Sequence, residues 1–600
     1  MKKQIAILVL AALMAAVSCE GFLSITPDDY ISDEAVFTDD VLAEAAVANI
    51  YGRVEWGQNI DDSKSYIYLD EACWSNGSPD QTYGYSDDFL RVYDYSLIRE
   101  INELILGFRA HGRTEKEGEL RFLRAWTYFN MARCMGGMPL IGDKVYSYTA
   151  GMDVTELQVP RCKEYEIYDY IIAECDSVAK MLPVEPSVNG ARAVKWTALA
   201  LKARAALYAA SLAKYNSDMA TPLSTPGGSV GIPASMADGY YEKALDAAKK
   251  IIESNKYELY KANADLGQNF YEALTVKSGN KEVIWSMDGI YPGRVTFWST
   301  NNFPTSHAEE ESSTNLTPIL NLVEAFEYTA DRDGTLKIED GGEAKILYDN
   351  EEDLFAGKDA RLWGTVIYPG ALLKGEPVVF QAGIAEPSGT GYTYRTGSAG
   401  EKADDGTLIT SINGPFMTND GQRNKSGFCV RKYLDETPKA STRQGSGMWF
   451  IRFRYAEILM IAAESSMELN HNDDALGYIN EIRRRAGIQD LTGTLTIDDI
   501  IRERRVEFAF EDHRWWDMRR LRIAHLIWDG DAANPQAVHY ALFPYRIHNP
   551  GNPDDGKWIF EKVATHMSAY PRWFQMRNYY NFLDQSWLSN NPKLEKNPYQ

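Results

Sequence analysis

Apolar residues near the C-terminal end of the chain recur at helical spacing and predict three successive helices. The first two patterns cover residues 455–469 and 475–486, and Gly487 follows the second as a plausible C-cap. Small alanine and serine residues on both faces favour close packing of these two helices. A third pattern starts near residue 497 and carries large apolar residues every seven positions, at Ile501, Phe508 and Trp515. We therefore predict one further helix through this stretch.

Three glutamates line one face of the predicted third helix, because Glu503, Glu507 and Glu511 are spaced four residues apart. One interpretation makes them a carboxylate cluster for metal binding or acid–base chemistry. The other pairs them with arginines three or four residues away, which are Arg504, Arg505 and Arg514. We favour the second interpretation and expect a half-buried ionic lock between packed helices.

Helical patterns also dominate the first half of the chain. Thr38 or Asp39 is placed to cap a helix through Tyr51, and an alanine- and aromatic-rich helix over 119–129 leads to Gly136 and Gly137. Further helices are predicted over 160–182, 193–212 and 240–254. The last two are rich in alanine, like the nested helix pairs of tetratricopeptide repeats. Because the repeat period is irregular, we predict a mostly α-helical, TPR-like scaffold.

Two segments depart from this helical pattern. Residues 57–86 alternate polar residues with tyrosine and tryptophan, and a long loop of this kind is usually functional. From about residue 280 to 447, glycine, proline, asparagine, serine and threonine become frequent. Short strands are predicted there at 282–285, and extended runs at 364–368 and 428–433. Long irregular loops and a few short strands therefore complete the predicted fold.

The N-terminal residues have the pattern of a bacterial lipoprotein signal peptide. Lys2 and Lys3 precede an apolar run from Ile5 to Val17, which is too short to span a bilayer. The run ends in small residues followed by Cys19, a junction that resembles a lipobox. We predict that residues 1–18 are removed and that Cys19 is lipidated; an ordinary secretory signal with an incidental cysteine is the alternative.

Composition and motifs narrow the range of functions. The net charge of −23 argues against nucleic acid as a partner. The chain contains no H-E-x-x-H, P-loop, G-x-G-x-x-G after a strand or C-x-x-C motif and no G-x-S-x-G nucleophile elbow, and no histidine pair has convincing ligand spacing. The run Asp331–Gly334 hints at a calcium loop, but a solvated turn is the better interpretation. We predict neither a metal nor a cofactor nor catalysis, although no pattern rules out a carboxylate pair for glycoside hydrolysis.

The aromatic content suits a protein that meets sugars or peptides with flat rings, although large cores also use aromatic residues. A sugar ring offers an apolar C–H face and a rim of hydroxyl groups, which an aromatic side chain and neighbouring amide, carboxylate or guanidinium groups can meet. Two non-helical segments, 74–83 and 290–298, provide this combination. The candidate glycan-binding residues are Trp74, Asn76, Tyr83, Tyr291, Arg294 and Trp298. For each aromatic residue, packing beneath a loop is the competing explanation.

The C-terminal block resembles the signature of the SusD/RagB family of nutrient-binding lipoproteins. That signature has the form R-x-A-E-x-L-L-x-x-A-E, then N-x-x-R-x-R-A-G, then E-R-R-x-E-F-x-F-E-x-x-R-W-x-D. The matching residues are Arg454, Ala456, Glu457, Leu459, Ala463 and Glu464; Asn480, Arg483, Arg485, Ala486 and Gly487; and Glu503, Arg504, Arg505, Glu507, Phe508, Phe510, Glu511, Arg514, Trp515 and Asp517. Tyr455 and Met460 depart from it without disrupting it. Residues 119–129 and Gly136–Ile141 resemble a second family landmark.

The resemblance implies a single SusD-like domain over 19–600. It divides into an N-terminal helical part (19–279), a loop-rich ligand-side insertion (280–447) and a C-terminal signature region (448–600). It also implies an outer-membrane lipoprotein that faces the cell exterior, captures oligosaccharides and passes them to a SusC-like TonB-dependent transporter. A RagB-like peptide binder and, less favoured, a surface glycoside hydrolase are the alternatives.

Overall fold

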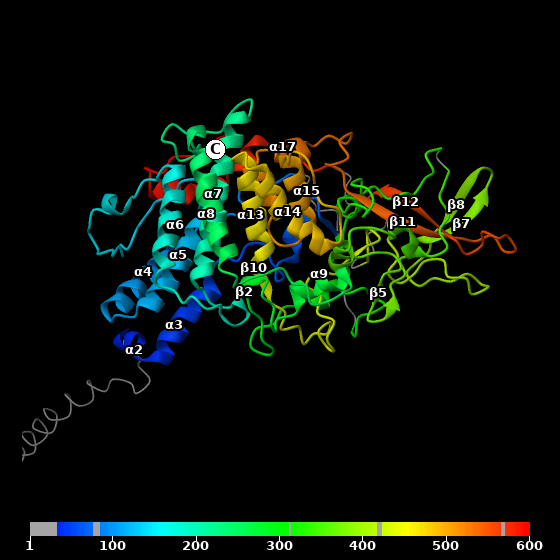
Figure 1. The fold of residues 1–600 in the computed structure, drawn as a ribbon, viewed down its shortest axis with the longest axis horizontal. Coiled ribbons are helices and arrows are strands. Elements are labelled where there is room, and N and C mark those ends of the chain that lie inside the picture. The colour runs from blue at the N-terminus through cyan, green and yellow to red at the C-terminus, as the bar shows by residue number, and fades with distance from the viewer. Residues whose placement is uncertain (1–32, 76–83, 311–313, 343, 417–422, 566–570) are drawn as a thin grey trace, which may run out of the picture.

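A row of packed helices forms the larger part of the molecule. The computed structural model describes residues 33–75, 84–310, 314–342, 344–416, 423–565 and 571–600. Helices α4 (Tyr95–Ala110), α5 (Thr114–Met135), α6 (Glu164–Val178), α7 (Lys195–Asp218) and α8 (Ala237–Glu253) pack each against the next. The row continues with α13 (Tyr455–Glu468) against α8 and α14 (Asn472–Ala486) against α13. The predicted TPR-like helical scaffold is confirmed (Figure 1).

Local sequence signals explain where several helices begin and end. Asp39 caps α3 (Asp40–Arg53), because its Oδ1 accepts hydrogen bonds from the amides of Val41 at 2.9 Å and Leu42 at 3.0 Å. Helix α5 ends at Gly136, whose φ of 82° suits glycine. A Cβ at Gly137 would collide with the carbonyl oxygen of Cys162. The G-G pair therefore both ends the helix and lets two segments approach closely.

The prediction of one continuous third C-terminal helix is wrong. Helix α15 (Ile497–Glu507) ends before Phe508, and α16 (Arg514–Arg520) begins after a turn. Two residues in that turn adopt positive φ, Phe510 at 60° and Asp512 at 62°. The turn places the Asp512 carboxylate 2.8 Å from Nη1 of the buried Arg452. Tertiary ion pairing thus overrides the helical pattern of the sequence.

The three glutamates do form an ionic lock, but it is fully buried and its partners are distant in sequence. Glu507 lies 2.9 Å from Arg361 and 2.6 Å from Arg454, and it also pairs with Arg485. The described members of this central ion-pair cluster include Glu282, Glu503, Glu507 and Glu511 with Arg361, Lys432, Arg454, Arg483 and Arg485. All are at most 5% exposed. The cluster joins α12 (Arg361–Thr365), β10 (Phe450–Arg454), α14 and α15.

The local arginines that we expected to pair with these glutamates have other partners. Arg504 lies 2.8 Å from Asp517, and Arg514 lies 2.7 Å from Asp70. Arg505 lies 3.2 Å from the same Asp70. Because these arginines point away from the glutamates, the predicted i, i+4 pairing is wrong although an ionic lock exists.

Short strands and loops build the other side of the molecule. The predicted strand near 282–285 is confirmed as β2 (Val283–Met287), which pairs antiparallel with β10. The extended runs appear as β4 (Val366–Ile367) and β9 (Cys429–Val430), which also pair. The remaining described elements of this side are α9 (Leu266–Thr275), α10 (Trp298–Asn302), α11 (Leu320–Val323), β1 (Ala72–Trp74), β3 (Leu316–Pro318), β5 (Leu372–Leu373), β6 (Glu376–Pro377) and α17 (Ala524–Ile527). Helix α18 (Gln585–Asn590) lies instead beside the start of α4.

A four-stranded sheet lies at the end of the molecule remote from α4–α6 (Figure 1). Its strand order is β12 (Trp558–Ala564), β11 (Tyr540–Ile547), β7 (Gly383–Ser388) and β8 (Gly391–Arg395). Strands β11 and β7 are parallel, and the two other neighbouring pairs are antiparallel. Residues of the sheet contribute to a second, smaller apolar core that includes Ala385, Phe543 and Ile559. The sequence analysis did not predict this sheet.

None of the described helices is both long enough and apolar enough to cross a bilayer. Residues 1–18, the predicted signal peptide, and Cys19, the predicted lipidation site, lie outside the described residues. Short 3₁₀ helices and α2 (Asp33–Thr38) complete the described elements; the 3₁₀ helices are Ser63–Tyr68, Val154–Leu157, Val188–Gly190, Ala234–Met236, Glu351–Phe355 and Met576–Tyr579.

Glu351 gives the fold a pH-dependent contribution to stability. The pKa of this carboxyl is raised to about 8, mainly by burial and to a lesser extent by the charge of Glu352, while the amide of Phe380 and the charge of Arg546 offset part of the increase. The folded protein therefore keeps the Glu351 proton above pH 4.3 or so, where the unfolded chain has released it. The stabilising contribution is complete below that pH and is lost as the pH rises through about 8.

We expect Glu351→Gln to weaken this pH dependence. In the unsubstituted chain, stability should fall by about 1 kcal/mol from Glu351 as the pH rises from roughly 6.5 to 7.5. The neutral amide does not titrate, so the variant should lose less stability over the same range. Urea unfolding at both pH values measures the difference. An identical pH dependence in the two proteins would contradict the raised pKa of Glu351 in the folded state.

Candidate functional site

The described start of the first predicted sugar-binding segment, Trp74 and Ser75, is connected through hydrogen bonds to α10, which follows the second segment. Trp74 ends β1 and pairs with Leu316 of β3. The amide of the following residue, Ser75, donates to the carbonyl oxygen of Asn315 at 2.9 Å. The amide of Asn315 donates in turn to the carbonyl oxygen of Asn301 in α10, also at 2.9 Å. The segment after residue 290 and the segment around residue 74 are therefore attached to one strand.

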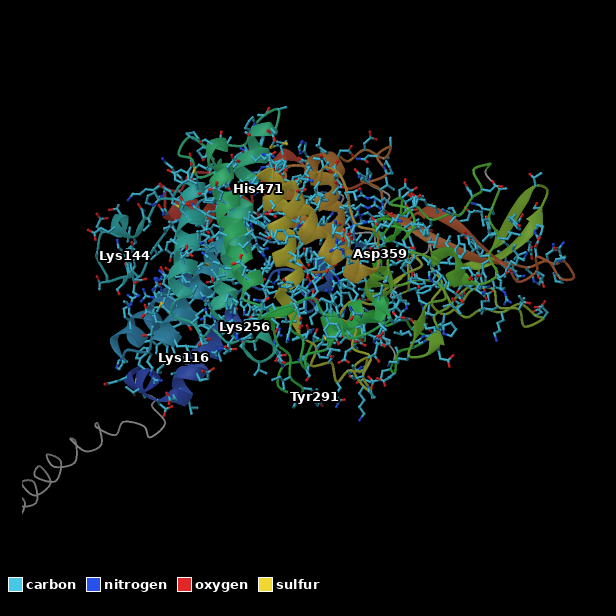
Figure 2. The ribbon with its side chains drawn as sticks, in the orientation of Figure 1. Lys116, Lys144, Lys256, Tyr291, Asp359 and His471 are labelled. Carbon is cyan, nitrogen blue, oxygen red and sulfur yellow. The ribbon has the colours of Figure 1, made fainter. Side chains whose placement is uncertain are left out.

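The turn before α10 exposes large apolar side chains to solvent. The backbone of Ile290 and Arg294 forms a reciprocal pair of hydrogen bonds, at 2.9 and 2.8 Å, which closes the turn. Ile290 is 66% exposed, Tyr291 51% and Phe297 47%. Figure 2 shows Tyr291 at the edge of the molecule, away from the packed helices. An exposed cluster of this kind is a candidate contact surface.

The turn is held by a neighbouring loop and a lysine. Thr296 and Ser446 pair through both backbone hydrogen bonds, at 2.8 and 2.9 Å. Lys277 Nζ lies 2.6 Å from Asp288 and donates to the carbonyl oxygens of Gly289 at 2.5 Å and Gly447 at 2.8 Å. The lysine thus ties the base of the turn to the base of the adjoining loop. This bracing holds the backbone of the turn that carries Tyr291.

One polar side chain contacts the exposed tyrosine, and the same turn carries an ion pair. Gln444 Nε2 donates to Tyr291 Oη at 2.6 Å. Arg294 Nη2 lies 2.7 Å from Asp61 Oδ2, and both side chains are about two-fifths exposed, at 41% and 42%. We call the set Asp61, Tyr291, Arg294, Phe297 and Gln444 the Tyr291 face. It combines two aromatic rings with amide, carboxylate and guanidinium groups, which is the chemistry that a sugar's apolar face and hydroxyl groups require.

The prediction of Trp298 as a sugar-stacking residue has to be corrected. Its side chain is 1% exposed. Its indole nitrogen donates to the carbonyl oxygen of Lys432 at 3.0 Å, and its ring packs edge-on against Tyr66. Trp298 begins α10 and points into the core, whereas its neighbour Phe297 points outward. Trp298 is therefore a packing residue that supports the turn.

The other predicted residues have mixed placements. Tyr291 and Arg294 lie together on the Tyr291 face. Trp74 is half-buried and packs against the main core. Asn76 and Tyr83 lie outside the described residues. The sequence analysis missed Asp61 and Gln444, because single polar residues in polar segments carry no signal of their own.

The described residues contain no group of three or more histidine, cysteine, aspartate or glutamate side chains that could hold a metal ion. In the run Asp331–Gly334, Asp331 accepts a hydrogen bond from the amide of Asp333 at 3.1 Å. Asp333 accepts hydrogen bonds from the amide and hydroxyl of Thr335 at 3.0 and 2.7 Å. These side chains bond to their own turn, as the interpretation of this run as a solvated turn predicts.

Comparison with known sequences identifies one family. The model of the SusD family matches residues 281–599. "SusD-like protein P2" of Formosa agariphila is 24% identical over 444 residues, which cover 72% of this chain and 70% of the relative. A "SusD-like protein" of Bacteroides ovatus is 23% identical over 540 residues, which cover 86% of this chain and 82% of the relative.

Solved structures share the fold. A SusD-like carbohydrate-binding protein of Bacteroides fragilis superposes with a TM-score of 0.64 at 19% identity, covering 94% of this chain and 100% of that structure. A laminarin-binding SusD-like protein superposes with a TM-score of 0.54 at 14% identity, covering 94% and 99%. At these identities the superpositions establish the common architecture of the chains.

Proposed function

Since this chain belongs to the SusD family, we propose that it is a glycan-binding lipoprotein of the cell surface that holds oligosaccharides on the Tyr291 face. The observation that carries the proposal is the exposed Tyr291 on a braced turn, beside Gln444 and the Arg294–Asp61 ion pair. Two structural neighbours support it, because one is a SusD-like carbohydrate-binding protein and the other a laminarin-binding SusD-like protein.

The chemistry of the face favours sugars with an accessible C–H face. Tyr291 can lie flat against one ring, and Phe297 adds a second apolar surface close by in the chain. Arg294 and Asp61 already neutralise each other, so the pair can offer hydrogen bonds to hydroxyl groups without demanding a charged ligand. Binding alone satisfies this proposal, and it assigns no catalytic step to the chain.

The proposal includes a lipid anchor and a transporter partner. Cys19 becomes the acylated first residue of the mature chain, which places the protein on the outer membrane facing the cell exterior. Residues 19–600 form one SusD-like domain with the three parts set out above. The helical row faces a SusC-like TonB-dependent transporter, and the loop-rich side (280–447) receives the glycan that is passed on to it.

Calorimetric titration tests the proposed function directly. The chain from residue 20 onward, which retains every described residue, is titrated with panels of neutral oligosaccharides and of peptides. We expect saturable heat with one glycan class and no change in the sugar recovered afterwards. Saturable binding of peptides alone would overturn the glycan assignment in favour of a RagB-like function. Release of shorter sugars would overturn it in favour of a hydrolase.

A further inference from the structure

A cavity of about 590 Å³ lies apart from the Tyr291 face. Its walls come from the start of α4, the segment after Gly137, the 3₁₀ helix Val154–Leu157 and α18. Figure 2 shows Lys144, which lines the cavity, at the end of the molecule formed by α4–α6, whereas Tyr291 lies on another edge. A volume of this size is typical of small-ligand sites. None of the residues on the Tyr291 face belongs to its lining.

Aromatic rings form one wall of the cavity in a fixed arrangement. The rings of Tyr93 and Trp587 are stacked, with centroids 3.6 Å apart and planes at 13°. Tyr95 meets Tyr93 edge-on at 5.1 Å, and its hydroxyl donates to the carbonyl oxygen of Pro139 at 2.7 Å. The guanidinium carbon of Arg91 lies 4.8 Å from the Trp587 ring centroid. Neighbouring groups therefore hold the rings in place without filling the cavity.

Hydrogen bonds between polar residues connect the walls of the cavity, and several other polar groups of the described lining have no hydrogen-bond partner. Gln158 Nε2 donates to the carbonyl oxygen of Asn590 at 2.9 Å, and Asn591 Nδ2 donates to that of Val159 at 2.8 Å. Among the described residues, the amino group of Lys144, the hydroxyl of Tyr93 and the side-chain amide of Asn590 have no hydrogen-bond partner. Two of these, on Lys144 and Asn590, belong to residues exposed to solvent.

The described lining of the cavity is positively charged, whereas the chain as a whole is negatively charged. The protein carries a net charge of −23, but the described cavity lining includes Arg99 and Lys144 and no aspartate or glutamate. Arg99 is already paired with Glu103 at 2.8 Å. Lys144 is thus the lining cation that is free to meet a negative group on a ligand.

We propose that this cavity is a second saccharide-binding site, which takes a sugar residue bearing an anionic group. The sugar ring lies against the aromatic wall formed by Tyr93, Tyr95 and Trp587, and Asn590 meets its hydroxyl groups. Lys144 pairs with the carboxylate of a uronic acid or with a sulfate ester. Both groups present negatively charged oxygen atoms to the ammonium group. The proposal rests on the proposed glycan-binding function and extends it to a second site of different charge preference.

The test uses the chain from residue 20 onward with a hexuronate disaccharide, a singly sulfated hexose disaccharide and the neutral hexose disaccharide of the same linkage. Calorimetry is performed on Tyr291→Ala, in which the first site is weakened. We expect this variant to retain one site per chain for at least one acidic disaccharide and to bind the neutral one at least tenfold more weakly. Whichever acidic ligand binds identifies the source of the negative charge.

Two rim substitutions locate the site. Val154, 47% exposed at the cavity, is replaced by tryptophan to obstruct the mouth, and Val188, 84% exposed and outside the lining, receives the same change as the control. Added to Tyr291→Ala, Val154→Trp should weaken acidic-sugar binding at least tenfold, while Val188→Trp should not change it. Lys144→Gln should bring the acidic-sugar affinity down to that of the neutral sugar.

The outcomes separate the two proposals. Loss of all sugar binding in Tyr291→Ala would overturn the second site and leave the first. Loss of all sugar binding in Val154→Trp alone, with normal binding in Tyr291→Ala, would support the cavity and overturn the Tyr291 face. Equal binding of neutral and acidic sugars in Tyr291→Ala would overturn the role of Lys144. No sugar binding in the unsubstituted chain would overturn both.

Discussion

Replacement of Glu507 by alanine is expected to lower the free energy of unfolding by about 3–5 kcal/mol. Glu507 is fully buried and pairs with Arg361, Arg454 and Arg485. Removing its carboxylate takes the shared counter-charge from three buried guanidinium groups. Three of their remaining partners are each shared with a second cation, namely Glu282, Glu503 and Glu511. Buried positive charge is therefore left under-compensated, which is costly. Urea unfolding followed by tryptophan fluorescence measures the change.

The matched control for Glu507→Ala removes an exposed ion pair from the same region. Asp490 lies within an ion pair with Arg484, whose side chain is 63% exposed. Exposed pairs of this kind contribute little to stability. Asp490→Ala should therefore leave the unfolding midpoint unchanged. A Glu507→Ala midpoint close to that of the control would show that the central ion-pair cluster does not hold the fold together.

The same cluster should make the protein sensitive to acid. Burial by itself would raise the pKa of Glu507, but Arg485, Arg454 and Arg361 more than offset this and hold its pKa well below the usual range. Burial also opposes a lowered pKa at Glu511, where Arg454 and Lys432 prevail. Because both pKa values are lower in the folded state, their contribution is present above about pH 4.3 and is lost as the pH falls through the folded values.

The helices could be predicted from the sequence because their signals are local. The alanine-rich pattern of α7 and α8, the Asp39 cap and the glycines after α5 each act over a few residues. The partners of Glu507 could not be predicted in this way. Arg361 is 146 residues away, and the choice between it and a nearby Arg504 is made by tertiary packing. The break between α15 and α16 follows from the same long-range pairing.

The candidate site, too, could be predicted only in part from the sequence. The sequence indicated that 290–298 carries aromatic and polar residues, but neighbouring Phe297 and Trp298 face opposite environments. Only the contacts of Trp298 with Tyr66 and Lys432 decide which ring is buried. Gln444 reaches Tyr291 from 153 residues away. The sheet that joins β7 to β11 likewise depends on a pairing between segments far apart in the chain.

Tyr291→Ala is expected to weaken binding of a neutral glycan by tenfold to a hundredfold, which corresponds to about 1.4–2.8 kcal/mol. The change removes the ring that is 51% exposed on the turn and leaves the backbone pairing of Ile290 with Arg294 in place. Tyr394→Ala, which removes an exposed ring from the four-stranded sheet, is the matched control and should not change affinity. Calorimetry with the glycan identified by the panel measures both variants.

Tyr291→Phe separates stacking from hydrogen bonding at the same position. It keeps the ring but loses the hydroxyl that accepts from Gln444. If stacking on the sugar dominates, Tyr291→Phe should retain affinity within about threefold, because one partly exposed hydrogen bond contributes little. If the hydroxyl meets the sugar, Tyr291→Phe should lose as much as Tyr291→Ala. Unchanged affinity in Tyr291→Ala, with the fold intact by thermal unfolding, would remove Tyr291 from the binding site. The glycan would then have to contact the molecule elsewhere, since the buried Trp298 cannot replace Tyr291 as a stacking surface.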